Sequence, residues 1–133
     1  MIQRSVVDYT FQRRAALADL RAGRRGRTEI CDAHPYLIRA ARFHGDKSDV
    51  PCPVCRADHL TLVHYVYGDE WKVGSGQAKS ARQVADMSER VSEFSVYVVE
   101  VCTSCDWNHL LEAFVTGVPV PPRVTARSRA KPL

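Results

Sequence analysis

The sequence lacks any long hydrophobic run. None of its 133 residues belongs to an apolar stretch approaching the ~18 residues that a membrane-spanning helix needs. The first 20 residues are interrupted by charged side chains, so they lack the continuous apolar segment of a secretory signal peptide. These two absences predict a cytoplasmic protein without a membrane partner.

Glycine is also scarce, and the motifs of common enzymes are missing. The seven glycines are scattered, so the chain has no glycine-rich loop that could hold a phosphate. We find no nucleophile elbow, no Ser/His/Asp set and no acidic spacing typical of paired-carboxylate catalysis. We therefore expect a protein that is not an enzyme and has no small-molecule substrate.

The composition that remains is that of an ordinary folded protein. Hydrophobic residues make up 45% of the chain and charged residues 26%, and the length suits a single domain. A domain of this size buries a modest share of its surface, so a bound metal would add useful stability.

Positive charge collects at the two ends of the sequence. The net charge is +4, but residues 1–27 carry seven arginines against two aspartates, residues 46–106 are net acidic, and residues 107–133 are again basic. Basic ends favour an anionic partner such as RNA or DNA, although they also serve solubility. The candidate nucleic-acid contacts are Arg13, Arg14, Arg24, Arg25, Arg27, Arg123, Arg127 and Arg129.

Four of the five cysteines form two C-x-x-C pairs. Cys52 and Cys55 make the first pair, and Cys102 and Cys105 make the second. Two residues between thiolates form a tight turn, here called a knuckle, from which both sulfurs can reach one ion. In a cytosolic protein this spacing indicates metal ligands rather than disulfides. Two knuckles supply the four sulfurs of a tetrahedral site.

Zinc is the metal that such a site favours. Zn²⁺ suits four soft ligands, and a closed four-cysteine site leaves no open position for catalysis, so the ion would be structural. An iron–sulfur cluster and a thiol redox pair remain alternatives. The positions after the knuckles are often glycine, but here they are Arg56 and Asp106. The fifth cysteine, Cys31, forms a C-x-x-H motif with His34 that has no second pair, so we expect a buried thiol beside a helix start.

Hydrophobic periodicity predicts the elements around these cysteines. Apolar residues at helical spacing predict a helix over 6–22, with an inward stripe of Val7, Phe11, Ala15, Ala18 and Ala22. A second helical region begins near 28 or 32, has Pro35 in its first turn and ends at Gly45. We expect a polar connection over 45–53 and a loop over 68–76. We expect strands over 60–67, 93–101 and 107–115, and a helix over 77–91.

These elements predict an α+β fold. Its centre is a three-stranded antiparallel zinc ribbon with an inserted helix, preceded by two or three N-terminal helices. The expected organisation is a helical region with a basic loop over 1–50, the ribbon over 51–117, and a mobile, proline-rich basic tail over 118–133.

Three stretches of the sequence resemble a small uncharacterised family of actinobacterial zinc-ribbon-like proteins. They are ICDAHPYLIRAARFHG at 30–45, PCPVC at 51–55 and YVVEVCTSCDWNHL at 97–110. The resemblance covers about 7–117 and brings no activity with it. It implies a bacterial cytosolic protein whose metal ligands are Cys52, Cys55, Cys102 and Cys105.

The sequence thus predicts a non-catalytic binding module held together by one structural Zn²⁺. Its basic ends would engage nucleic acid, or a nucleoprotein machine such as RNA polymerase or the ribosome. A protein–protein adaptor is the alternative, and a thiol redox or metal sensor is a weaker one.

Overall fold

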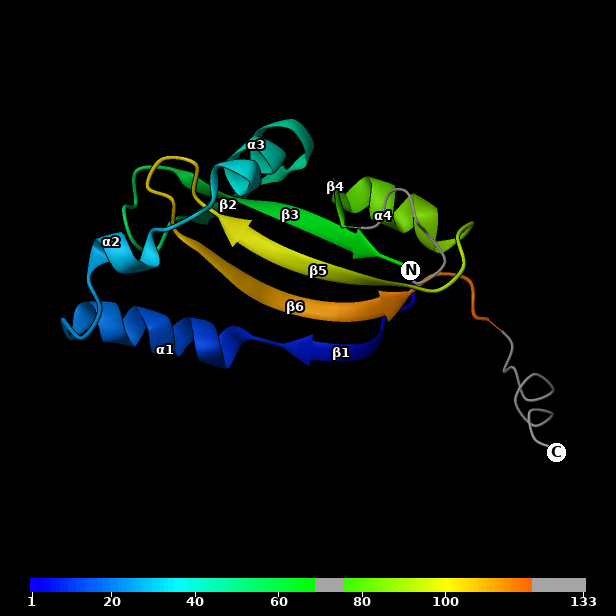
Figure 1. Cartoon of the computed structure of the whole chain (residues 1–133), viewed down its shortest axis with the longest axis horizontal. Helices are drawn as coiled ribbons and strands as arrows, with labels where there is room; N and C mark the ends of the chain where they lie inside the picture. The colour runs from blue at the N-terminus through cyan, green and yellow to red at the C-terminus, as the bar shows by residue number, and fades with distance from the viewer. Residues whose placement is uncertain (69–75, 121–133) are drawn as a thin grey trace, which may run out of the picture.

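The structure is a computed structural model that describes residues 1–68 and 76–120. Within these ranges the chain forms one antiparallel sheet of six strands together with four helices (Figure 1). The expected α+β class is confirmed, but the sheet has more than the three strands predicted. The predicted loop over 68–76 and the tail beyond 120 lie almost wholly outside the described residues.

The sheet is built around three long neighbouring strands. Its order is β1-β6-β5-β3-β2, and the short strand β4 pairs with β3 on the same side as β2. The strand bounds are β1 Arg4–Asp8, β2 Asp46–Pro51, β3 His59–Tyr67, β4 Gln77–Lys79, β5 Phe94–Val101 and β6 Asn108–Thr116. The central strands β3, β5 and β6 confirm the three predicted strands to within two residues.

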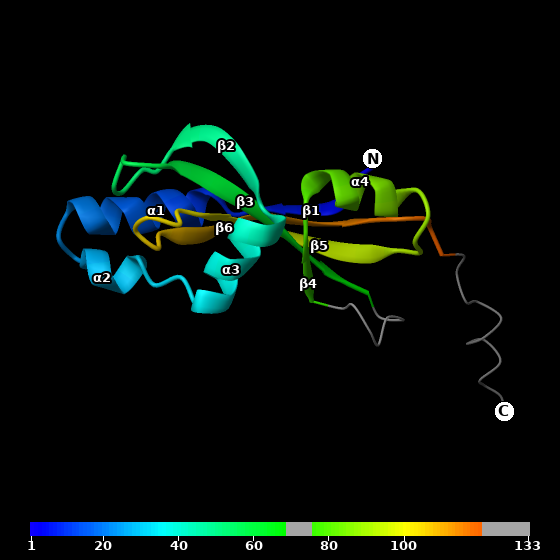
Figure 2. The same ribbon diagram turned by 90° about the horizontal axis from the view of Figure 1, so that it is seen from above.

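The helices are short, and their bounds are α1 Thr10–Arg21, α2 Arg27–Ile30, α3 Pro35–His44 and α4 Ala81–Ser88. Helices α1, α2 and α4 lie toward the ends of the sheet, whereas α3 packs on one of its faces (Figures 1 and 2). Helices α1 and α2 lie at one end of the long axis and α4 lies at the other, as both views show (Figures 1 and 2). No helix in the described ranges has the length and apolarity that crossing a bilayer requires.

The predicted helix over 6–22 was wrong at its start and on its buried side. Residues 4–8 form β1, which pairs with β6, and α1 begins only at Thr10. Val7 and Phe11 of the predicted stripe are 47% and 73% exposed, whereas Ala16 and Leu17 are buried. The helix turns this other side inward because Arg13, one turn before Leu17, reaches the buried carboxylate of Glu100.

Two short strands, β2 and β4, were not predicted from the sequence. The polar connection over 45–53 is the edge strand β2, and the helix over 77–91 is preceded by the strand β4. Both strands lack an alternating apolar pattern because none of their residues is buried. Ser80 then starts α4 as a capping box, with its hydroxyl accepting from the Gln83 N–H and the Gln83 side chain accepting from the Ser80 N–H.

The core divides into three clusters on the two faces of the sheet. On one face of β5, Phe94, Val96 and Val98 pack with Val84 of α4, and Glu100 continues this face toward α1. The opposite face holds Val63 and Val101 against Ala41 of α3. The third cluster surrounds the cysteines at the end near α1. This third cluster positions the candidate site.

Candidate metal centre

Each C-x-x-C pair forms the turn of a β-hairpin. The first knuckle joins β2 to β3, and the second joins β5 to β6. Because β3 and β5 are neighbours in the sheet, with Thr61 opposite Val101, the two turns emerge at the same end. The sheet thus brings together two pairs that are 46 residues apart in the chain.

The two knuckles have the same backbone geometry. In each, the first cysteine accepts a hydrogen bond on its carbonyl from the N–H four residues later, at 3.1 Å from Arg56 to Cys52 and 2.9 Å from Asp106 to Cys102. Arg56 and Asp106 both have left-handed backbone, with φ of 56° and 71°. The absence of glycine after each pair therefore does not prevent the turn, at the steric cost that a side chain pays there.

The four sulfur atoms lie at the spacing of ligands to a single ion. All four Sγ atoms are within 4.8 Å of one another. Cys55 Sγ lies 3.6 Å from Cys102 Sγ, and Cys52 Sγ lies 3.7 Å from Cys105 Sγ. A tetrahedral site with metal–sulfur bonds of ~2.3 Å has sulfur–sulfur edges of about 3.8 Å. The residues predicted from the sequence as a metal set can therefore hold a metal ion without rearrangement.

Backbone amides point at the sulfurs, as they would to stabilise thiolates. The N–H of Val54 donates to Cys52 Sγ and the N–H of Ala57 donates to Cys55 Sγ, both at 3.4 Å. Burial raises the pKa of the Cys102 thiol, against the opposing pull of backbone N–H groups from the same turn. Burial acts in the same direction on the Cys105 thiol and raises its pKa.

Cys55 is the thiol whose pKa falls. Burial would raise this pKa, but the Ala57 N–H and the three neighbouring thiols together lower it to about 7. A bound divalent ion would take the place of the protons on all four sulfurs.

Asp58 ties the two knuckles together outside the sulfur cluster. Its carboxylate accepts from Lys47 Nζ at 2.7 Å, from Ser104 Oγ of the second knuckle at 2.8 Å and from the His59 N–H at 2.8 Å. The hydrogen bonds from Lys47, Ser104 and His59, in that order of effect, lower the pKa of Asp58 to about 2.

A buried carboxylate supports the second knuckle from behind. Trp107 is fully buried and directly follows the knuckle, and its Nε1 donates to Glu100 Oε2 at 2.8 Å. Arg13 Nε donates to the same oxygen at 2.6 Å. Sequence reasoning missed Glu100, although its place on the inward face of the apolar strand β5 was a usable signal.

The remaining cysteine lies against the cluster. Cys31 is half-buried at the end of α2, and its Sγ is 3.9 Å from Cys105 Sγ. His34 is not part of the cluster, because its Nδ1 accepts from the Tyr36 N–H and caps the start of α3. Cys31 was expected as a buried thiol beside a helix start; it is instead half-buried at the end of α2, with a sulfur neighbour that the sequence did not indicate.

The predicted nucleic-acid contacts fall into three groups. Arg13 is in the ion pair with Glu100, and its side chain is 21% exposed. Exposed side chains on α1, α2 and their connection are those of Arg14, Arg24, Arg25 and Arg27, of which Arg24 pairs with Asp19 at 2.8 Å. Arg123, Arg127 and Arg129 lie outside the described residues.

Comparison with known proteins extends the resemblance. An uncharacterized protein of Mycobacterium bovis and uncharacterized proteins of two strains of Mycobacterium tuberculosis are each 50% identical to this chain over 117 residues, which is 88% of this chain and 85% of the relative. No solved structure matches the chain. The profile of one family of unknown function, DUF5318, matches residues 1–130. The expected relation to uncharacterised actinobacterial proteins is confirmed, and the chain belongs to the DUF5318 family.

Proposed function

We propose that this protein is a non-catalytic nucleic-acid-binding module, closed by one structural Zn²⁺ and contacting its partner through the arginines of α1–α3. The observation that carries the proposal is the meeting of two features at one end of the sheet. The four sulfurs lie at single-ion spacing there, and the helices covering that end carry an excess of arginine.

Zinc is the ion that best fits the sulfur cluster. The spacing of 3.6–3.7 Å leaves room for one ion between the sulfurs, whereas an iron–sulfur cluster would hold them farther apart around several irons. Four soft sulfur ligands in tetrahedral array are typical of structural zinc. Cys52, Cys55, Cys102 and Cys105 would hold the ion, and with all four positions taken it would have no site for a substrate.

The arginine excess is concentrated on the helices. Residues 10–44 contain eight arginines and only three acidic residues. Apart from Arg13, these arginines are exposed: Arg14, Arg21, Arg24, Arg25, Arg27, Arg39 and Arg42. Guanidinium groups bind phosphate with paired N–H donors, so a surface of this kind matches a nucleic-acid backbone.

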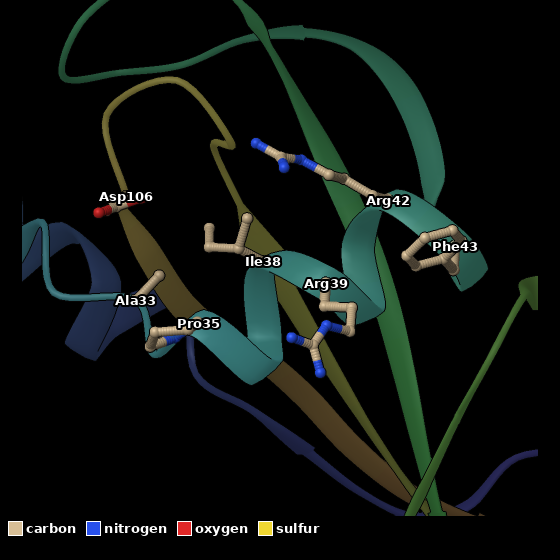
Figure 3. A pocket seen from close by; sticks show the side chains of 7 residues that line it. All are labelled: Ala33, Pro35, Ile38, Arg39, Arg42, Phe43 and Asp106. Carbon is tan, nitrogen blue, oxygen red and sulfur yellow. The ribbon is translucent and has the colours of Figure 1, made fainter.

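A pocket between α3 and the second knuckle provides a site for a nucleotide. It has a volume of about 400 Å³ and is lined by Ile38, Arg39, Arg42, Phe43 and Asp106, among others. Figure 3 shows the arginine side chains extending from α3 on either side of Ile38. Phe43 is 77% exposed at its rim. Apolar and aromatic groups beside two guanidinium groups can stack a base while its phosphate is bound, so single-stranded RNA or DNA is the ligand this surface favours.

Fluorescence anisotropy with labelled single-stranded RNA and DNA tests the interface. Replacing both Arg39 and Arg42 by serine should weaken binding at least about tenfold and make the salt slope shallower by about 1.4, since two phosphate contacts are lost. The matched control replaces Arg82 of α4 and Arg90, two residues after that helix, at the opposite end of the sheet, and makes the same change in net charge. Equal weakening by both doubles, or no binding at low salt, would rule out this interface.

The zinc part of the proposal has its own experiment. Elemental analysis of protein purified without added metal should give about one zinc per chain. Cys52→Ser and Cys102→Ser should lose the ion and unfold at a lower temperature than the wild type, because metal binding is coupled to folding. Iron in place of zinc, or the absence of any metal, would contradict it.

The basic tail belongs to the same proposal. Deleting residues 121–133 removes Arg123, Arg127 and Arg129, and should weaken binding and flatten its salt dependence. Co-purification with RNA polymerase or ribosomes that is lost on nuclease treatment would place the module on one of those machines.

One observation favours a protein adaptor as the second candidate. The edge strand β1 and the start of α1 expose Val6, Val7 and Phe11, at 51%, 47% and 73%. An exposed edge strand with apolar side chains is a surface for adding a strand from a partner protein. A complex that survives nuclease and is abolished by Val7→Lys would favour the adaptor over the nucleic-acid module.

A further inference from the structure

We propose that Cys31 and Cys105 form an oxidisable dithiol, which a peroxide converts to a disulfide and thereby opens the metal centre. This goes beyond the proposed function, and depends on it only for the release of an ion. The two sulfur atoms are 3.9 Å apart, a separation similar to those within the four-cysteine cluster. Cys31 is a fifth thiol in contact with a site that needs four.

The position of Cys31 is fixed by bonds to the second knuckle. The N–H of Ala33 donates to the Asp106 carbonyl at 3.0 Å, and Asn108 Nδ2 donates to Asp32 Oδ1 at 3.0 Å. These two hydrogen bonds hold residues 32 and 33 against the turn that contains Cys105. Cys31 therefore stays beside Cys105 because of contacts that do not involve either sulfur.

The distance that must close is short. A disulfide has a sulfur–sulfur bond of about 2.05 Å, so the two atoms would approach by less than about 2 Å. Cys31 terminates a helix of only four residues, and the 22–26 connection before that helix is exposed. A small movement of this end of the chain can supply the approach, whereas Cys52 and Cys102 are fully buried.

One molecule of hydrogen peroxide is the oxidant for the pair of thiols. The Cys31 sulfur attacks the O–O bond of hydrogen peroxide, giving a sulfenic acid, and the other oxygen leaves as water with the thiol proton. The Cys105 sulfur then attacks the Cys31 sulfur and hydroxide leaves, so Cys105 would no longer be available as a ligand to an ion. The two cysteines together lose two electrons and the peroxide gains two. An ion held by the four cysteines would keep three sulfur ligands and would be bound more weakly.

The experiment follows the ion and the disulfide separately. Zinc-loaded wild type and Cys31→Ser are treated with a few equivalents of hydrogen peroxide, zinc release is read with a coloured chelator, and disulfides are mapped by mass spectrometry. We expect the wild type to release zinc with Cys31–Cys105 as the first disulfide, reversibly on adding dithiothreitol and zinc. The variant should retain zinc at least about tenfold longer. Cys31→Ala is a second variant, and zinc content and the thermal transition before oxidation confirm that each is folded.

Two results would overturn the proposal. One is equal zinc release from the wild type and both Cys31 variants. The other is a first disulfide that joins a different pair, such as Cys52 and Cys55. Mapping is repeated on metal-free chain, where Cys31–Cys105 as first product supports the dithiol and any other pair counts against it. Failure of the zinc site is thus distinguishable from failure of the dithiol.

Discussion

At the scale of single residues, Glu100 joins the helical cover to the cysteine-bearing hairpin. Its side chain is 4% exposed, and its carboxylate accepts from both Arg13 and Trp107 at one oxygen. Arg13 belongs to α1, and Trp107 directly follows the second knuckle. Replacing a buried ion pair by apolar residues can be neutral, but removing one partner leaves a charge buried without compensation.

Truncating this carboxylate should therefore destabilise the protein strongly. We expect Glu100→Ala to lower the free energy of unfolding by about 3–5 kcal/mol, measured by urea denaturation of the metal-loaded protein. Arg24→Ala is the control, because it removes an exposed ion pair with Asp19 and should change stability by less than about 1 kcal/mol. Similar small effects for both variants would show that Glu100 does not couple α1 to the knuckle.

His64 gives the fold a dependence on mild acid. Its ring is 11% exposed, and its Nδ1 has no hydrogen-bond partner in the described residues. Burial lowers the pKa of His64 below its ordinary 6.5, against the smaller raising effect of Asp46, whose Oδ2 is 3.9 Å away. Lys79 lies opposite it on β4.

Because the pKa of His64 is lowered on folding, acid destabilises the folded protein. The folded protein disfavours the charged ring, so its stability is complete above pH 6.5 and falls as the pH drops toward the lower pKa of the folded state. Denaturation measured from about pH 8 to about pH 5 should show a steeper loss of stability in the wild type than in His64→Gln. Both proteins have the same four-cysteine cluster, so the acid sensitivity of that cluster cancels in the comparison. Parallel curves would contradict the assignment.

At the scale of elements, the predictable strands were β3, β5 and β6, each of which has a neighbouring strand on both sides. β3 and β5 are central, and β6 lies between β5 and β1, so their apolar residues recur in the pattern that sequence reasoning can detect. The strands β1, β2 and β4 are held by pairing along one side, and their side chains are largely exposed or half-buried. Their own amino-acid composition therefore gives no signal of that pairing.

The candidate site was predictable for a different reason. Its four cysteines come in two local pairs, and the C-x-x-C spacing of each pair predicts its own turn. Only the meeting of the two turns at one site had to be inferred from the rest of the sequence. The contact between Cys31 and Cys105 depends on how α2 is placed by Asp32 and Ala33, which is tertiary information. The buried face of α1 likewise depends on Glu100 in a strand 87 residues away from Arg13.

Gly45 is the joint between α3 and the sheet. Its N–H closes the helix on the Ala41 carbonyl at 3.1 Å, and β2 starts at the next residue. A Cβ at this position would lie 2.4 Å from Thr61 Cγ2 and 2.5 Å from the Ala41 carbonyl oxygen. Thr61 is buried in β3, so neither neighbour can yield without moving the helix from the sheet.

Gly45→Ala should accordingly lower the free energy of unfolding by about 1–3 kcal/mol through overpacking. Gly26→Ala is the matched control, since the nearest atom to its Cβ would be Glu29 Oε1 at 3.6 Å, an ordinary contact. We expect the control to change stability by less than about 1 kcal/mol, the range of an N-cap substitution. Chemical denaturation of both proteins decides between them, and equal stabilities would mean that α3 shifts freely.

At the scale of the whole molecule, the two ends of the sheet are stabilised by different means. The end near α4 is closed by apolar packing, in which Val66, Val84, Val96 and Phe114 are buried together. At the other end the buried cluster consists of Ala16, Leu17, Ile30 and Leu60 around the cysteines and Trp107. The long strands β3, β5 and β6 connect these ends (Figure 1).

Removal of the metal should therefore loosen the molecule from one end. Without the ion, nothing joins the sulfurs of the two knuckles, and burial opposes charge on the thiols. The amides of α1, α2 and both turns should therefore lose their protection from hydrogen exchange first. The apolar cluster around Val66, Val96 and Phe114 contains no ligand and should keep its amides protected. Hydrogen exchange, resolved by residue before and after treatment with a strong zinc chelator, measures this gradient. A uniform rise in exchange across both ends would mean that the ion stabilises the whole sheet cooperatively, and an unchanged pattern would mean that the sulfur cluster holds its shape without a metal.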